Sequence, residues 1–78
     1  MNVYVVLRTV DYEGTEVRAV FEDRVDALNF CKVQIEKQIE PSEPLYDAFH
    51  ILIGYKILDL SYTIEEFEIL YRTRDSKT

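Results

Sequence analysis

The stretch VYVVLRTVDYEGTEVRAVFE, residues 3–22, decides the fold of this 78-residue chain. Apolar and polar side chains alternate in residues 3–10 and again in residues 15–22, and both segments are rich in the residue types that favour strands. Residues 11–14, Asp-Tyr-Glu-Gly, have the Asp and the Gly that short hairpin loops use. We therefore expect a β-hairpin whose shared apolar face consists of Val3, Val5, Leu7, Val17, Ala19 and Phe21.

A helix follows the hairpin and is expected to cover that apolar face. Asp23 is a good N-cap, Asp26 lies near the positive end of the helix dipole, and Pro41 ends the helical pattern, which predicts a helix over residues 24–40. A helical period of 3.6 residues places one apolar stripe against the hairpin. The stripe contains Ala27, Leu28, Cys31, Ile35 and Ile39.

Phe30 and Val33 lie off this stripe, beyond the reach of a two-stranded sheet. Another element or another chain is therefore expected to cover them. Tyr4, on the opposite face of the first strand, and Tyr12, in the turn, are expected to be exposed.

Residues 41–60 allow more than one interpretation. Pro41 and Pro44 form a rigid break, and Ser42 is placed to cap a short helix over residues 43–52 that presents Leu45, Ala48, Phe49 and Leu52 together. Residues 53–60 are apolar on both faces, so periodicity does not distinguish a buried strand from a helix that continues past Gly54.

Residues 62–72 also fit two structures. Thr63 and Glu66 form a capping box for a helix, whereas Thr63, Glu65, Phe67, Ile69 and Tyr71 alternate as a strand, which we favour. The sequence thus predicts one α+β domain over residues 1–72, in which an antiparallel sheet packs on one main helix, with a frayed polar tail at 73–78. Residues 43–60 would add a short second helix or an extra strand.

The order of these motifs resembles a family of small domains of unknown function from bacteriophages and low-GC Gram-positive bacteria. The resemblance rests on the Val-Tyr-Val-Val opening strand with its Asp-Tyr-Glu-Gly turn, the Val-Phe before the helix, and the closing Ile-Glu-Glu-Phe-Glu-Ile. It covers residues 3–39 and 62–70 and implies a ββα unit completed by a last strand. Residues 41–60 depart from the pattern, and the resemblance supplies no catalytic residues.

Composition bounds the environment and the partners. Fifteen acidic and nine basic residues give a net charge of −6, which repels nucleic-acid backbones and suits a basic protein partner. A single cysteine and the lack of a secretory pattern in residues 1–8 favour a cytoplasmic setting. The apolar stretch 45–60 contains Asp47, His50, Lys56 and Asp59 and is too short to cross a membrane.

The residues that catalysis or metal binding would require are scarce. Cys31 lies on the core stripe and His50 is the sole histidine, so a four-ligand zinc site cannot be assembled from Cys and His. Gly14 and Gly54 are too few for a phosphate-binding loop. We therefore expect neither an enzyme nor a cofactor.

The leading hypothesis is a non-catalytic protein-binding module, a phage or mobile-element inhibitor of a host protein. An acidic surface that mimics nucleic acid is one version of it, and it requires Glu16, Glu22, Glu65, Glu66 and Glu68 on one face. The alternative is a structural subunit that forms a homodimer and has no independent activity. The candidate contact residues are aromatic, apolar and acidic: Phe30, Val33, Tyr46, Phe49, Tyr55, Glu65, Glu66 and Glu68.

Overall fold

The computed structural model describes residues 1–37 and 41–69 of the chain. These residues form one helix and one five-stranded antiparallel sheet, which confirms the predicted α+β class. In chain order the elements are β1 (Asn2–Val10), β2 (Gly14–Phe21), α1 (Arg24–Glu36), β3 (Glu43–Tyr46), β4 (Leu52–Ile57) and β5 (Leu60–Glu68).

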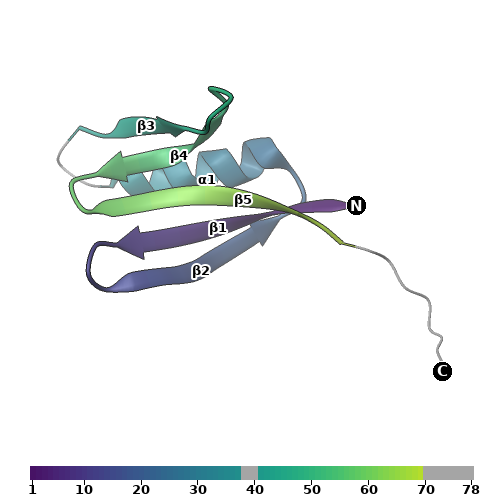
Figure 1. Cartoon of the computed structure of the whole chain (residues 1–78), viewed down its shortest axis with the longest axis horizontal. Helices are drawn as coiled ribbons and strands as arrows, with labels where there is room; N and C mark the ends of the chain where they lie inside the picture. Colours follow the sequence, from purple (N-terminus) through teal and green to yellow (C-terminus); the bar gives the residue numbers. More distant parts are fainter. Residues whose placement is uncertain (38–40, 70–78) are drawn as a thin grey trace.

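The strands lie in the order β2-β1-β5-β4-β3, so the last strand occupies the centre of the sheet (Figure 1). β5 pairs with β1 along its whole length, from Asn2↔Glu68 to Val10↔Leu60. The first and last strands of the described chain are therefore neighbours in the sheet. The edge strand β3 carries Pro44, a residue that removes a backbone donor and is tolerated mainly at sheet edges. The predicted closing strand is therefore confirmed, and it lies beside the first.

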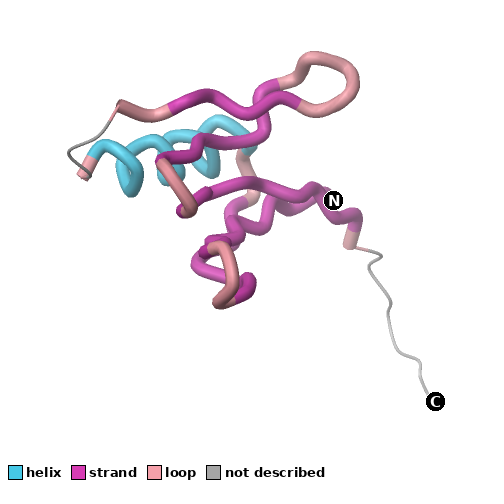
Figure 2. Tube along the Cα trace, turned by 60° about the vertical axis from the view of Figure 1, so that its left-hand side comes forward, coloured by secondary structure: helices cyan, strands magenta, loops and turns pink. Residues whose placement is uncertain are grey.

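α1 forms a second layer on one face of the sheet (Figure 2). The predicted N-cap is confirmed, because the Asp23 side chain accepts a hydrogen bond of 2.9 Å from the Val25 amide. The helix ends at Glu36, earlier than predicted, and residues 38–40 lie outside the described part. The core between the layers consists of Val6, Ala27, Cys31, Ile35, Ile57, Tyr62 and Ile64.

The face of β1 that meets the helix differs from the expected one. Val6 is fully buried and Tyr4 packs against the core, so the expectation that Tyr4 is exposed was wrong, whereas Tyr12 is exposed as predicted. Val3, Val5 and Leu7 lie on the opposite face. The cause is that β1 is apolar on both faces, so alternation alone does not choose between them.

A β-bulge separates the apolar residues of β2 onto two faces. The β1–β2 register shifts between Val6 and Leu7: Val6 pairs with Ala19, but Leu7 pairs with Val17, which leaves Arg18 as the extra residue. Ala19 therefore faces the helix layer and Val17 faces away from it. The single shared face that we expected for Val17, Ala19 and Phe21 is therefore wrong.

The predicted helix over residues 43–52 is also wrong. β3 and β4 form a hairpin there, with β3–β4 register pairs from Glu43↔Lys56 to Tyr46↔Leu52. β4 pairs with β5, and this pairing buries Ile57 between the layers. Burial that comes from pairing with a distant strand is not visible in the local periodicity of the sequence. Of the open alternatives at 53–60 and 62–72, the structure thus takes strands, while residues 70–78, including the predicted tail, lie outside the described part.

Among the described residues, no helix combines the length and the apolar character that crossing a membrane requires.

Candidate functional site

The loop between β3 and β4 is held in one conformation by Asp47. Its side chain accepts hydrogen bonds from the Phe49 amide at 2.8 Å and from the Ile51 amide at 3.0 Å. The Asp47 backbone amide donates to the Ile51 carbonyl at 3.0 Å, and the His50 amide donates to the Asp47 carbonyl at 3.0 Å. His50 adopts a left-handed conformation with φ of 62°. We call residues 46–51 the β3–β4 tip.

The β3–β4 tip presents apolar side chains to solvent. Phe49 is 80% exposed, Tyr46 is 55% exposed and Ile51 is 48% exposed. In Figure 2 the loop projects beyond both layers of the fold. Four hydrogen bonds thus fix a loop whose largest side chain packs against little of its own chain.

The base of the β3–β4 tip is attached to the helix. Arg24, the first residue of α1, donates from its guanidinium to the carbonyl of Leu52, the first residue of β4. Val25, the next helical residue, is 62% exposed. Apolar surface therefore lies on both sides of this contact, on the tip and on the first turn of α1.

The other predicted contact residues lie elsewhere, and some serve the core. Phe30 is half-buried, and its ring lies 5.6 Å from the ring of Phe21 between centroids, so β2 reaches it and the expectation that it needs another cover was wrong. Tyr55 is half-buried and packs against the core. Val33 lies off the core stripe and is 51% exposed on α1, so no element of the described chain gives it the expected cover.

The acidic residues do not share one face. Glu65 pairs with Val5 in the register and faces away from α1, whereas Glu66 and Glu68 alternate to the opposite side. Glu66 accepts a hydrogen bond from the Asn2 side-chain amide. Glu16 lies near the other end of β1 and pairs with Arg8 at 3.4 Å and Arg18 at 3.2 Å. This distribution lacks the single carboxylate array that nucleic-acid mimicry requires.

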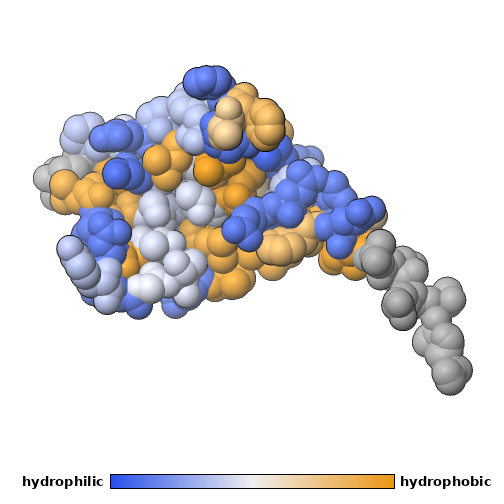
Figure 3. Space-filling model, viewed as in Figure 1, coloured by the Kyte–Doolittle hydropathy of each residue, from blue (hydrophilic) through white to orange (hydrophobic). Residues whose placement is uncertain are grey.

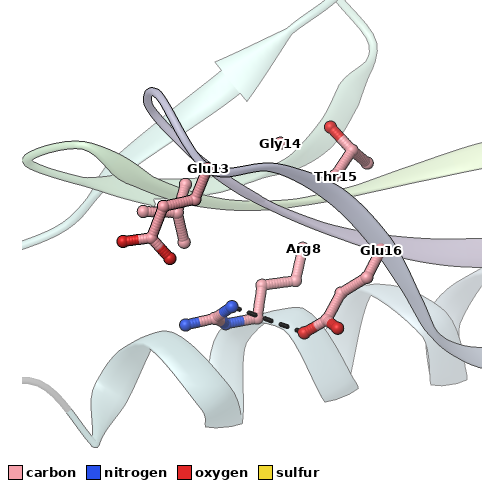
Figure 4. A pocket seen from close by; sticks show the side chains of 6 residues that line it. Arg8, Glu13, Gly14, Thr15 and Glu16 are labelled. Atoms are coloured by element: carbon pink, nitrogen blue, oxygen red, sulfur yellow. Dashed lines mark hydrogen bonds and ion pairs between the residues drawn. The ribbon is translucent and has the colours of Figure 1, made fainter.

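A shallow hollow of about 280 Å³ lies beside the β1–β2 turn. Arg8 and Glu16 point from the strands toward the side on which α1 lies, and Thr15 points the other way (Figure 4). The Arg8 guanidinium is already paired with Glu16, so the hollow offers a ligand little uncompensated charge. It is therefore a weaker candidate than the β3–β4 tip.

The single cysteine and the single histidine are not a catalytic pair. Cys31 is fully buried in the core, and burial raises the pKa of its thiol to about 11, whereas His50 is exposed on the β3–β4 tip. A protonated, inaccessible thiol is a poor nucleophile. Within residues 1–37 and 41–69, no three or more His, Cys, Asp or Glu side chains are grouped to hold a metal ion.

The sequence analysis names the two aromatic residues of the β3–β4 tip as contact residues, which stays a prediction, and it does not identify the side chain that fixes the loop. Tyr46 and Phe49 were predicted as contact residues, whereas Ile51 and the bracing role of Asp47 were not. The available signal was an Asp between two apolar segments, because Asp side chains commonly bond backbone amides in turns. The competing helical pattern concealed it.

The chain matches no protein-family model, and no curated protein or solved structure shows significant similarity to it. The resemblance to phage and Gram-positive domains therefore stays a prediction.

Proposed function

We propose that this protein is a non-catalytic protein-binding module that engages its partner through the β3–β4 tip. The observation that carries the proposal is the exposure of Phe49, 80%, on a loop fixed by the Asp47 hydrogen bonds. Aromatic side chains are enriched among the residues that contribute most to binding, where they fill a pocket on the partner.

Preorganisation is what distinguishes this loop from an ordinary exposed turn. A loop that must become ordered on binding loses affinity, because its conformational entropy is lost at that step. Asp47 removes most of that cost before the partner arrives, since it already bonds the amides of Phe49 and Ile51. The tip therefore has both an apolar anchor and a fixed shape.

The charge of the chain favours a basic partner. A net charge of −6 on a small domain accelerates encounter with a positively charged protein and repels nucleic acid. An inhibitor of a host protein remains the role that we propose for such a module, without nucleic-acid mimicry. The partner would supply an apolar pocket for Phe49, surrounded by basic residues.

A pull-down tests the proposal. The purified protein is immobilised and exposed to a lysate of the cells in which it naturally occurs. The wild-type chain and Leu58→Ala should retain one stoichiometric partner, and Phe49→Ala should lose it. Leu58 is the matched control, because it is 74% exposed but lies in the β4–β5 turn, away from the tip.

Affinity for the recovered partner is then measured with the purified proteins. Removal of an aromatic anchor costs about 2 kcal/mol or more at such positions, which is a loss of at least about 30-fold. A partner that binds Phe49→Ala as tightly as the wild type would exclude the tip as the main contact.

A further inference from the structure

The face of the sheet opposite α1 carries apolar side chains that nothing in the described chain covers. We call it the open face. Val17 is 61% exposed, Val20 is 57% exposed and Phe67 is 48% exposed, and β1 adds three half-buried side chains between them. The apolar residues of β1, β2 and β5 on this face are Val3, Val5, Leu7, Val17, Val20 and Phe67.

The open face is poor in charge although the chain is strongly acidic. Thr9 and Thr15, whose hydroxyls lie 2.9 Å apart, continue it with neutral polar groups, as do Ser61 and Thr63. Figure 3, viewed from the side away from α1, shows apolar and weakly polar residues through the middle of this face. On β1, β3, β4 and β5 the charged residues of this face are Glu43, Lys56 and Glu65.

This charge distribution selects the occupant. A basic partner would bind best to a surface that carries many carboxylates. The open face carries few, so it does not suit a basic partner. Two chains that each carry −6 repel one another, so they can associate only through a surface that keeps their acidic residues apart. The open face is such a surface, and its occupant is therefore a second copy of this chain.

The two central charges on the open face are arranged to complement themselves. Thr63 of β5 lies in one row with Leu7 and Gly54. Glu65 lies two residues beyond this row, and Lys56, which pairs with Ser61, lies two residues on the other side, each about 7 Å away at the rise of a strand. A two-fold axis along the row brings Glu65 of one copy near Lys56 of the other.

We propose that the protein forms a two-fold symmetric homodimer by face-to-face packing of the open faces. Two such sheets pack about 10 Å apart with their strands nearly aligned, which gives a four-layer arrangement with the helices outside. Symmetry forms the Glu65–Lys56 contact twice. This dimer is a separate proposal from the binding function above, and its tests address other residues.

Sedimentation equilibrium over a wide range of protein concentrations tests the dimer. The wild type should show a monomer–dimer equilibrium, and Val20→Glu should weaken it at least about tenfold, because it places a charge in the apolar contact. Val33→Glu is the matched control, since Val33 is similarly exposed but lies on α1.

A charge exchange tests the orientation of the two copies. Glu65→Lys should weaken the dimer about tenfold, because it would set two cations against each other across the interface. Adding Lys56→Glu should restore most of the loss. Lys56→Glu alone completes the double-mutant cycle. Glu43 lies opposite residue 56 within the chain, so it affects Lys56→Glu and the double variant equally and cancels in the cycle.

Two results would overturn the proposal. One is a wild-type chain that stays monomeric at every concentration. The other is a dimer that is insensitive to Val20→Glu and is lost with Val33→Glu, which would place the interface on the helix. Circular dichroism and the denaturation midpoint of each variant establish that it is folded.

Discussion

At Gly54 the neighbouring strand leaves no room for a side chain. A Cβ atom there would lie 2.0 Å from the Tyr62 carbonyl oxygen and 2.7 Å from the Thr63 Cα, and both are backbone atoms that cannot rotate away. We expect Gly54→Ala to lower the free energy of unfolding by about 3 kcal/mol, as severe overpacking does. Urea denaturation measures this directly.

Gly14→Ala is the matched control for that substitution. A Cβ at Gly14 would meet nothing within 4 Å, so the only cost is its positive φ of 103°. That cost is about 1 to 2 kcal/mol for a residue with a side chain. If both substitutions cost the same, close strand contact is not the reason for glycine at position 54.

Cys31 makes stability depend on pH in the alkaline range. Burial raises its pKa from 9.0 to about 11, so the folded state favours the protonated thiol. This contribution is fully present below pH 9 and is lost as the pH rises toward 11. Subtracting the profile of Cys31→Ala removes the titration of the lysines and tyrosines, and the remaining difference should fall with rising pH in this window.

The β3–β4 hairpin is the element whose order depends on one side chain. Asp47→Ala removes the acceptor of the Phe49 and Ile51 amides, so we expect a loss of about 1 kcal/mol in stability and faster hydrogen exchange at these two amides. Asp47→Asn keeps a side-chain carbonyl oxygen and should restore most of the protection. Unchanged exchange in Asp47→Ala would mean that the backbone bonds alone hold the loop.

The elements differ in how far the sequence predicts them. The β1–β2 turn and the Asp23 cap depend on neighbouring residues, and both were predicted correctly. The bulge that places Val17 and Ala19 on opposite faces depends on pairing with β1, and the β3–β4 hairpin depends on pairing with β5. Local periodicity contains neither interaction, which explains the wrong helix at 43–52 and the wrong face of β1.

The same distinction applies to the candidate site. Tyr46 and Phe49 were identified because exposed aromatic residues favour interfaces, and that reasoning needs no fold. Phe30 was misjudged because its neighbour Phe21 is brought to it only when the helix packs across β2. Contacts between distant segments decide which aromatic residues are left for a partner.

For the whole molecule, the excess of acidic residues should make stability increase with salt. The net charge is −6, and both ion pairs between side chains in the described part of the chain involve the exposed Glu16. Salt screens the repulsion among the many carboxylates more than it weakens these exposed pairs. We expect the free energy of unfolding to rise by about 1 kcal/mol from low to physiological sodium chloride, or roughly 4 to 8 °C in Tm.

Glu68→Gln tests the origin of that increase. Glu68 and Glu66 lie on the same side of β5, two residues apart, in the most acidic strand of the sheet. Removal of one of these charges should raise Tm at low salt and reduce the further rise that salt produces, because part of the repulsion is already gone. Thermal denaturation at a protein concentration low enough for the chain to be monomeric separates this effect from dimerisation. A Tm that falls with added salt would show instead that attractive pairs dominate the electrostatics of the fold.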